Sequence, residues 1–356
     1  MKKLINNRNY MLNKTTKKLV DEITKNLAAG QESISSSFGE LLNLLIDKLQ
    51  LSQDKKFVFV LLGKTGVGKS STINSLLSQK IAPVGKYDAT TMEVQEYEHE
   101  INGVKCSIID TPGLCDDLPE KGNNQKYIKL IQSKINQIDL LWFVTRLDDS
   151  RVGEDEKKGI QIISEAFTSK VWEHSVIIFT RANKADDYLE ELQERTKRIR
   201  DEIAKHTGHE IAKKIPSVAV DNKSETTPDG KRWLEELYTQ VLIRMSERGA
   251  IPFLMATAHR INKTQSNKTN KDPNWTFYNQ SEFKNEGEED VNREFNVNDF
   301  IFNGIQKELI KKKLIEVIPA LAATGASAGA VVGGPIGAAI GGVVGAAVGS
   351  IFYFFS

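Results

Sequence analysis

The feature that most constrains this chain is an apolar segment that runs directly into a glycine-rich loop. Residues 57–62 (Phe-Val-Phe-Val-Leu-Leu) have the composition of a strand buried on both faces of a parallel sheet. The loop follows at once, and a helix is expected over about 69–77. In such a strand, Gly-x-x-x-x-Gly-Lys-Ser loop and helix, backbone N–H groups surround a phosphate. The chain is therefore predicted to bind a nucleoside phosphate.

The loop supplies the first set of predicted ligand contacts. We expect Lys69 to reach the β- and γ-phosphates and to act as a catalytic residue, and Ser70 to coordinate Mg²⁺ through its hydroxyl. Gly66 and Gly68 keep the loop free of side chains that would collide with the phosphates. The predicted contacts are Gly63, Lys64, Thr65, Gly66, Val67, Gly68, Lys69, Ser70 and Ser71.

A second motif follows about forty residues later. The apolar strand expected at 106–109 ends at Asp110, which runs into Thr-Pro-Gly. This order predicts that Asp110 lies beside the metal and that the N–H of Gly113 points to the γ-phosphate. No glutamine that could orient an attacking water follows Gly113, since Leu114 and Cys115 stand there. Hydrolysis by the monomer is therefore expected to be slow.

A threonine pair lies between these two motifs. Thr90 or Thr91 could complete the metal shell when GTP is bound and so order a switch loop. The sequence does not distinguish the two, and threonines that lead into a strand over 92–97 are an equally good interpretation. The predicted metal ligands are Ser70, Thr91 and Asp110.

The base-recognition segment has two interpretations. The strand expected at 176–179 ends in Thr-Arg-Ala-Asn-Lys-Ala-Asp, residues 180–186. In the first, Asn183 and Asp186 form the guanine-reading Asn-Lys-x-Asp pattern, although it begins three residues later than usual. In the second, Arg181 stacks on the base and Asn183 stands where the aspartate normally is. Both interpretations predict guanine.

Strand and helix patterns alternate through the chain. Further strands are expected at 140–144 and 217–220, and helices around 124–136, 155–168, 186–206 and 231–247. This alternation predicts a doubly wound α/β fold with a mostly parallel sheet. We divide the chain into an N-terminal helical segment (1–52), a nucleotide-binding domain (53–250), a polar Asn-rich linker (251–310) and a C-terminal Gly/Ala-rich segment (311–356).

The C-terminal segment has the composition of a membrane segment. Residues 317–355 contain no charged side chain, and glycines recur at every fourth position from Gly325 to Gly349. Pro335 divides the run into halves of roughly 20 residues, each long enough to span a bilayer. We predict membrane association, as a helical hairpin or as one kinked span. The alternative is a buried Ala/Gly hairpin in a soluble assembly.

Charge and cysteine content exclude other classes. Lys and Arg number 48 against 47 Asp and Glu, so long-range electrostatics favours no nucleic acid partner. Two cysteines do not make a disulfide framework, which fits a reducing cytosolic environment, and residues 1–20 lack the apolar run of a secretory signal.

Taken together, the motifs resemble the AIG/Toc GTPases, relatives of septins that include chloroplast outer-envelope import receptors and immune-associated nucleotide-binding proteins. The segments that carry the resemblance are 63–77, 109–114, 146–152 (Arg-Leu-Asp-Asp-Ser-Arg-Val) and 179–181. The resemblance implies a P-loop GTPase fold, GTP or GDP with Mg²⁺ as ligands, and a homodimer formed through the G-domain face. It also implies that Arg151 reaches the partner's phosphates as a catalytic residue, and that the base is contacted by Thr180, Arg181, Asp221 and Asn222.

We therefore expect a membrane-anchored GTPase with its G domain facing the cytosol, which hydrolyses GTP slowly and acts as a nucleotide-dependent dimerisation switch. One alternative is a GTP-assembled membrane scaffold, and another is a membrane-perturbing effector regulated by its G domain. An ATPase is the weaker competitor, because a phosphate-binding loop does not by itself select the base. Neither the membrane nor the effector protein is identified by the sequence.

Overall fold

The structure is a computed structural model of the 356-residue chain, and it describes residues 55–82, 94–111, 124–260, 300, 302–310, 312–314 and 316–317. Residues 56–249 belong to one compact unit, and the described residues from 250 onward belong to a second. The expected N-terminal helices, Thr90, Thr91, Gly113 and the glycine-rich run lie outside the described residues.

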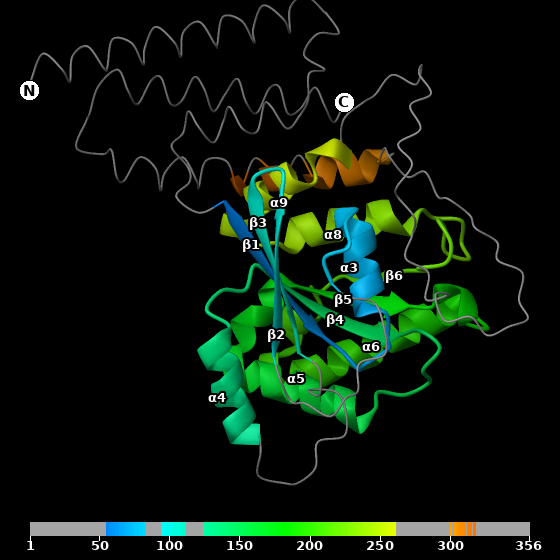
Figure 1. The fold of residues 1–356 in the computed structure, drawn as a ribbon. Helices are drawn as coiled ribbons and strands as arrows, with labels where there is room; N and C mark the ends of the chain where they lie inside the picture. The colour runs from blue at the N-terminus through cyan, green and yellow to red at the C-terminus, as the bar shows by residue number, and fades with distance from the viewer. Residues whose placement is uncertain are drawn as a thin grey trace, which may run out of the picture. The chain divides into compact units, whose positions relative to one another are not determined.

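The first unit is built on a six-stranded sheet (Figure 1). Its strands are β1 (Lys56–Leu62), β2 (Gln95–Ile101), β3 (Val104–Asp110), β4 (Leu140–Arg146), β5 (Ser175–Thr180) and β6 (Ser217–Ala219). They lie in the order β2-β3-β1-β4-β5-β6. Five run parallel, with β1 between β3 and β4, and β2 pairs antiparallel with β3. The predicted α/β fold with a mostly parallel sheet is confirmed.

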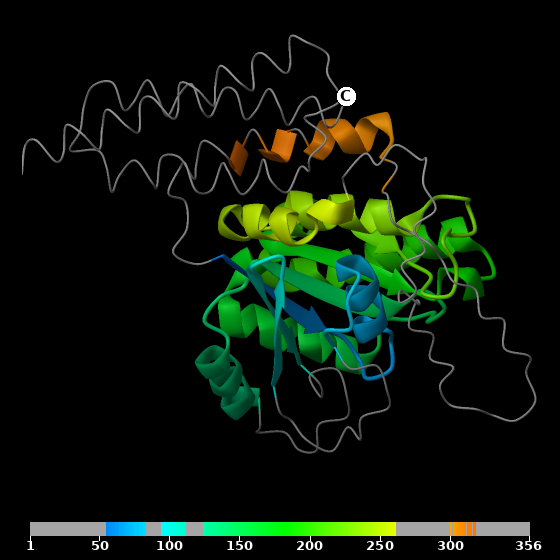
Figure 2. The same cartoon turned by 45° about the horizontal axis from the view of Figure 1, so that its top comes forward.

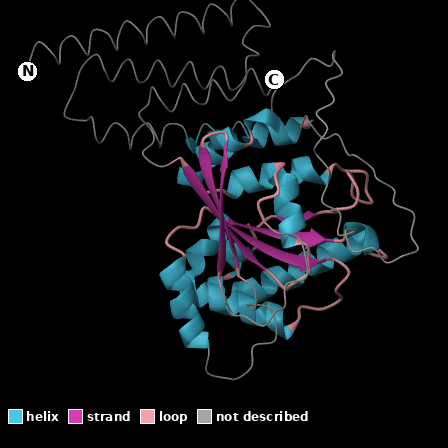
Figure 3. Ribbon diagram, in the orientation of Figure 1, coloured by secondary structure: helices cyan, strands magenta, loops and turns pink. Residues whose placement is uncertain are grey.

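Helices cover both faces of this sheet. The helices of the unit are α3 (Lys69–Leu77), α4 (Asn124–Lys134), α5 (Glu154–Phe167), α6 (Tyr188–Thr207), α7 (His209–Ala212) and α8 (Trp233–Arg244), with 3₁₀ turns η2 (Ser169–His174) and η3 (Ala182–Lys184). Helices α3 and α8 lie on one face, and α4, α5 and α6 lie on the other (Figures 1 and 2). In Figure 3 the strands form the middle layer between these helices.

Successive side chains of β1 point to opposite faces of the sheet, and both faces are buried. Val58, Val60 and Leu62 belong to a core cluster with the isoleucines of α4, α5 and α6. Phe57 and Phe59 point to the opposite face, where the Phe59 ring lies 5.5 Å from that of Trp142. All six of the residues 57–62 are at most 3% exposed. Burial on both faces is therefore what the unbroken apolar run specifies.

The edge strand β2 has no apolar run, and for this reason its full extent is not predictable from hydropathy. Its sequence is Gln-Glu-Tyr-Glu-His-Glu-Ile, and only Ile101 is fully buried. It joins β3 through Asn102 and Gly103, which both have positive φ (51° and 74°), as in an Asn-Gly hairpin turn. Glutamates along a free edge disfavour pairing with another strand.

The second unit contributes a helix across the predicted domain boundary. Helix α9 (Glu247–Ala256) spans residue 250 and is followed by the 3₁₀ turn η4 (Ala258–Arg260). Residues 304–310, 312–314 and 316–317 are also helical. The guanidinium carbon of Arg260 lies 4.9 Å from the centroid of the Phe300 ring. Within the described part of the chain, no helix combines the length and the apolar character that a membrane crossing requires.

Candidate functional site

The candidate site lies where the parallel strands end. The loop after β1, Asp110 at the end of β3, the segment after β4, Thr180 at the end of β5 and Asp221 after β6 all follow carboxyl ends. In open α/β sheets ligands bind at this edge, where the chain changes direction about the first strand. The fold therefore brings together residues that the sequence distributes over more than 150 positions.

The phosphate-binding loop has the backbone that its glycines predict. Gly63 has φ +154°, and a Cβ there would stand 2.1 Å from the carbonyl oxygen of Val144. Gly68, with φ +102°, is the N-cap of α3, and no side chain caps that helix. The first turn of α3 also contains no acidic residue. Its free N–H groups and its dipole therefore fit an anion such as a phosphate.

Lys69 is held within this loop. Its side chain is 6% exposed, and its Nζ donates to the carbonyl oxygens of Gly63 (2.7 Å) and Lys64 (3.0 Å). The same Nζ lies 3.5 Å from the carboxylate of Asp110. Ser70 stands one residue further along, in the first turn of α3. The predicted lysine, serine and aspartate thus share one corner of the sheet.

These residues would coordinate a metal only together with phosphate oxygens of the nucleotide and with water. No group of three or more His, Cys, Asp or Glu side chains that could hold a metal by itself occurs among the described residues. A hydroxyl and a carboxylate beside a phosphate site fit Mg²⁺, which keeps several waters and uses substrate oxygens as ligands. Ser70 and Asp110 are the described residues that would hold it.

Thr180 links the phosphate-binding loop to the base side. It is 1% exposed, and its hydroxyl donates to the carbonyl oxygen of Val67 at 2.6 Å and lies 3.3 Å from that of Thr145. Asn222 packs on the same loop, with its Nδ2 3.0 Å from the hydroxyl of Thr72. A Cβ on Gly68 would lie 3.3 Å from both Thr180 and Asn222. With its positive φ, position 68 therefore favours glycine over any residue that carries a Cβ.

The predicted base-binding residues lie on the loops after β5 and β6. Arg181 has a left-handed backbone (φ 61°), and its guanidinium lies 3.7 Å from the carboxylate of Asp148. The carboxylate of Asp221 accepts backbone N–H groups of Lys223 and Asn183, and burial raises its pKa above the ordinary value.

The two candidate guanine readers are both exposed and make different contacts. The backbone of Asn183 bonds to Asp221, and the N–H of Asp186 donates to Glu191 beside the start of α6. Helix α6 is capped by the next residue, Asp187, whose side chain accepts from the N–H of Glu190.

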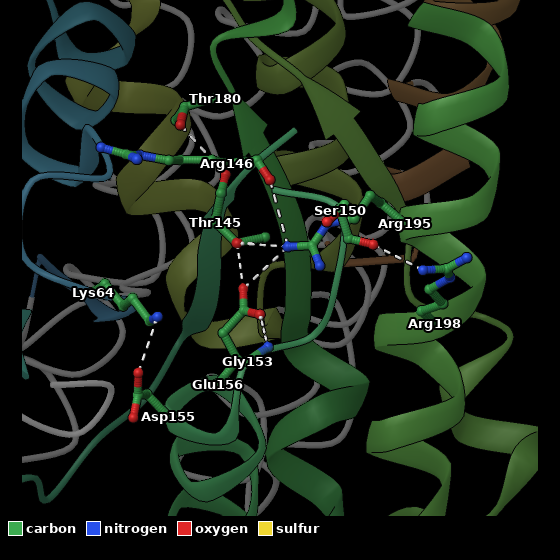
Figure 4. Close-up of polar contacts among 10 residues, drawn as sticks. All are labelled: Lys64, Thr145, Arg146, Ser150, Gly153, Asp155, Glu156, Thr180, Arg195 and Arg198. Carbon is green, nitrogen blue, oxygen red and sulfur yellow. Dashed lines mark hydrogen bonds and ion pairs between the residues drawn. The ribbon is translucent and has the colours of Figure 1, made fainter. Parts of the chain in front are cut away.

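Arg151 lies on the segment between β4 and α5. Its side chain is exposed and makes no hydrogen bond or ion pair with any other residue that the structure describes. On neighbouring helices, the carboxylate of Glu156 bonds to the guanidinium of Arg195 at 3.2 Å. Figure 4 shows these two side chains meeting at Thr145, beside the segment that carries Ser150 and Gly153.

Sequence reasoning missed this supporting network. The only local signal is Glu156 three residues after Gly153, the spacing of a capping box, and its carboxylate does accept the N–H of Gly153 at 2.8 Å. The nucleotide contact of Lys64 stays a prediction; its ammonium pairs with Asp155 at 2.9 Å, and this hydrogen bond raises the pKa of Lys64. Arg195 gives no signal, because its partners are distant in sequence.

The part of the chain that carries these residues matches a known protein family. The family model described as AIG1 family matches residues 58–272, which include the phosphate-binding loop, Asp110, Arg151 and the base-side loops. The chain belongs to the AIG1 family. The resemblance predicted from the motifs is thereby confirmed.

Relatives of this AIG1 protein include chloroplast translocon components. It is 33% identical to translocase of chloroplast 33 of Arabidopsis thaliana over 158 residues, which are 44% of this chain and 49% of that protein. It is 31% identical to the translocase of chloroplast 34 homolog of Chlamydomonas reinhardtii over 229 residues, 56% of each. The matched segments span about half the length of these two curated relatives.

Solved structures of related proteins are also similar. A crystal structure of Toc33 from Arabidopsis thaliana in complex with GDP and Mg²⁺ is 25% identical and covers 61% of this chain and 91% of that one, with a TM-score of 0.44. A second structure (25% identity, 62% and 91% coverage, TM-score 0.45) comes with the finding that dimerization is important for the GTPase activity of atToc33 and psToc159.

Proposed function

We propose that this AIG1 protein binds GTP and GDP with Mg²⁺, hydrolyses GTP slowly, and acts as a switch whose G domain dimerises according to the bound nucleotide. The observation that carries the proposal is the uncapped N-terminus of α3, with buried Lys69 and Asp110 beside it. Within a strand, glycine loop and helix, this arrangement fits the phosphates of a nucleotide.

The roles of the residues follow from their chemistry. With nucleotide bound, Lys69 would exchange its carbonyl partners for the β- and γ-phosphates. Ser70 and Asp110 would hold Mg²⁺, which would supply positive charge beside the phosphate oxygens. Thr91 and the N–H of Gly113 complete the γ-phosphate side. These two lie outside the described residues.

Guanine is the base we propose. Thr180 holds the base-side loop against the phosphate-binding loop, and Arg181, Asn183 and Asp221 lie on the adjacent loops. The bond between Asn183 and Asp221 supports the interpretation in which Asn183 lies beside the base. Competition binding decides the question, since a preference for ATP over GTP would contradict the proposal.

Dimerisation is proposed because Arg151 has no partner among the described residues. A cation on an exposed loop at the nucleotide edge can stabilise charge that develops on a phosphate in the facing subunit. Dimerisation would therefore add charge stabilisation in trans to a site in which no water-orienting glutamine follows Gly113.

The test measures mass and turnover of the 356-residue chain by light scattering and phosphate release, with GDP or a non-hydrolysable GTP analogue. We expect nucleotide to double the mass, Lys69→Ala to abolish nucleotide binding, and Arg151→Ala to weaken the dimer and slow turnover. Lys170→Ala is the matched control, because Lys170 is an exposed cation before β5, at the opposite end of the sheet. A protein that stays monomeric with every nucleotide would exclude the switch.

Membrane attachment rests on composition alone. The uncharged run over 317–355 supports it, and the G domain would then face the cytosol. Flotation with liposomes tests this, with a chain ending at Ile310 as the comparison. Equal flotation of both chains would contradict the anchor.

A further inference from the structure

The segment that carries Arg151 is fixed to the G domain at three points. The N–H of Leu147 donates to the carbonyl oxygen of Thr180 at 2.9 Å. The carbonyl oxygen of Ser150 accepts from Nη1 of Arg198 at 2.8 Å, and the N–H of Gly153 donates to Glu156 at 2.8 Å. The bonds hold the start, the middle and the end of residues 147–153, which we call the arginine loop.

One of these anchors, Glu156, belongs to a buried charged cluster with Arg195. The side chains of Glu156 and Arg195 are 5% and 3% exposed, and both bond to the hydroxyl of Thr145. Arg195 also lies 3.4 Å from the carbonyl oxygen of Arg146, the last residue of β4 (Figure 4). Nη2 of Arg195 therefore contacts Thr145, Glu156 and the backbone of Arg146, and Glu156 in turn bonds the N–H of Gly153, so the pair connects the two ends of the loop.

The anchor of Ser150, Arg198, is a half-exposed residue on α6, the helix that also carries Arg195. Arg198 lies three positions after Arg195 on α6, so one face of this helix supplies both guanidinium groups. Its side chain is 48% exposed, and it also pairs with Glu194 at 3.5 Å. The bond to Ser150 lies one residue before Arg151. Arg198 therefore bonds the backbone directly before the exposed arginine.

The arginine loop is also connected to the phosphate-binding loop. Thr180 bonds to Val67 through its hydroxyl and to Leu147 through its carbonyl oxygen. On the other side, Lys64 pairs with Asp155 at the start of α5. The position of the arginine loop is thus defined relative to the nucleotide site of its own subunit.

We propose that Glu156, Arg195 and Arg198 are positioning residues, which hold the arginine loop so that Arg151 projects toward the partner's nucleotide. This inference rests on the proposed dimerisation. In this proposal Arg198 does not contact a phosphate. It acts by bonding the backbone of Ser150, next to Arg151. Loss of that bond allows the loop to take other conformations, and dimerisation then has to order it again.

The test uses Arg198, because a half-exposed side chain can be removed without unfolding the domain. We expect Arg198→Ala to weaken the dimer formed with a non-hydrolysable GTP analogue about tenfold, the effect of one lost charge-assisted hydrogen bond. The GDP affinity of the monomer should not change. Arg198→Lys, which retains a donor, should recover part of the loss.

Two comparisons separate positioning from other effects. Glu194→Gln is the matched control, because it removes the other partner of Arg198 and leaves the bond to Ser150, so the dimer should keep its strength. In an Arg151→Ala background, Arg198→Ala should produce no further loss, since its effect passes through Arg151.

Each outcome decides the matter. If Arg151→Ala weakens the dimer and Arg198→Ala does not, the positioning role is wrong and the proposed function stands. The role is also wrong if Arg198→Ala weakens the dimer equally with and without Arg151. If the dimer forms but Arg151→Ala has no effect on it, the proposed role of Arg151 fails, and the positioning role fails with it.

Discussion

Replacement of Gly68 by alanine tests how closely the phosphate-binding loop and the base-side loops approach each other. Gly68 has φ +102°, so alanine there takes on a left-handed backbone that costs about 1–2 kcal/mol. Its methyl group would also stand 3.3 Å from Thr180 and from Asn222. Neither neighbour can move freely, because Thr180 bonds to Val67 and Asn222 bonds to Thr72.

The magnitude follows from these two contributions. Displacing one or both neighbours weakens hydrogen bonds worth about 1 kcal/mol each, so the total loss should be about 2–4 kcal/mol. Gly103→Ala is the matched control, since Gly103 also has a positive φ (+74°) but nothing lies within 4 Å of the added carbon. This control should lose only the backbone contribution of about 1–2 kcal/mol.

The assay is urea unfolding of the nucleotide-free protein in EDTA, with the free energy of unfolding extrapolated to water. GDP affinity is measured on the same variants. We expect Gly68→Ala to lose more stability than Gly103→Ala and to bind GDP more weakly, whereas Gly103→Ala retains wild-type affinity. Equal losses of stability in the two variants would refute the close packing of Thr180 and Asn222 on Gly68.

Three further predictions concern buried polar groups. Glu156→Met should lower the free energy of unfolding by about 3–5 kcal/mol, because it leaves the Arg195 charge buried, and adding Arg195→Met should recover most of the loss. If the double variant is no more stable than the single one in denaturant unfolding, the ion-pair argument is wrong. Thr180→Val should cost about 1–2 kcal/mol and weaken GDP binding in calorimetry, because the carbonyl oxygen of Val67 loses its donor; unchanged affinity would argue against the link. Asp221→Asn should change the pH dependence of stability: burial raises the pKa of Asp221, so wild type loses stability as pH rises from the unfolded pKa of about 3.9 through the raised native value, and the variant lacks this loss. Parallel stability curves of the two proteins from pH 3 to 7 would contradict it.

The nucleotide corner was predictable because its signals are local. An apolar strand, a glycine loop and a helix follow one another within 21 residues, 57–77, and each is specified by neighbouring positions. The same holds for Asp110, which stands directly at the end of an apolar strand. Local patterns do not predict elements that lack a clear hydrophobic period. Strand β2 is polar because it lies at the edge of the sheet, and α7 is only four residues long, too short to show a period.

The support of the site was decided by the tertiary structure alone. Glu156 and Arg195 are 39 residues apart, Arg198 and Ser150 are 48 apart, and Thr72 and Asn222 are 150 apart. No spacing rule relates such pairs, because they meet only after β4, β5 and β6 have aligned their carboxyl ends. Lys64 shows the same limit, since only the packed structure places Asp155 within reach of its ammonium.

The sequence by itself therefore determined the fold class, the phosphate chemistry and the family, because these depend on hydrophobic period and on short motifs whose residues act on their own neighbourhood. The tertiary structure decided how the loops are held relative to one another: which side chains pack on Gly68, which residues bond Asn183 and Asp186, and what fixes the loop of Arg151. The physical reason is that buried polar groups must find partners wherever packing brings them, and those partners are set by strand order rather than by sequence distance.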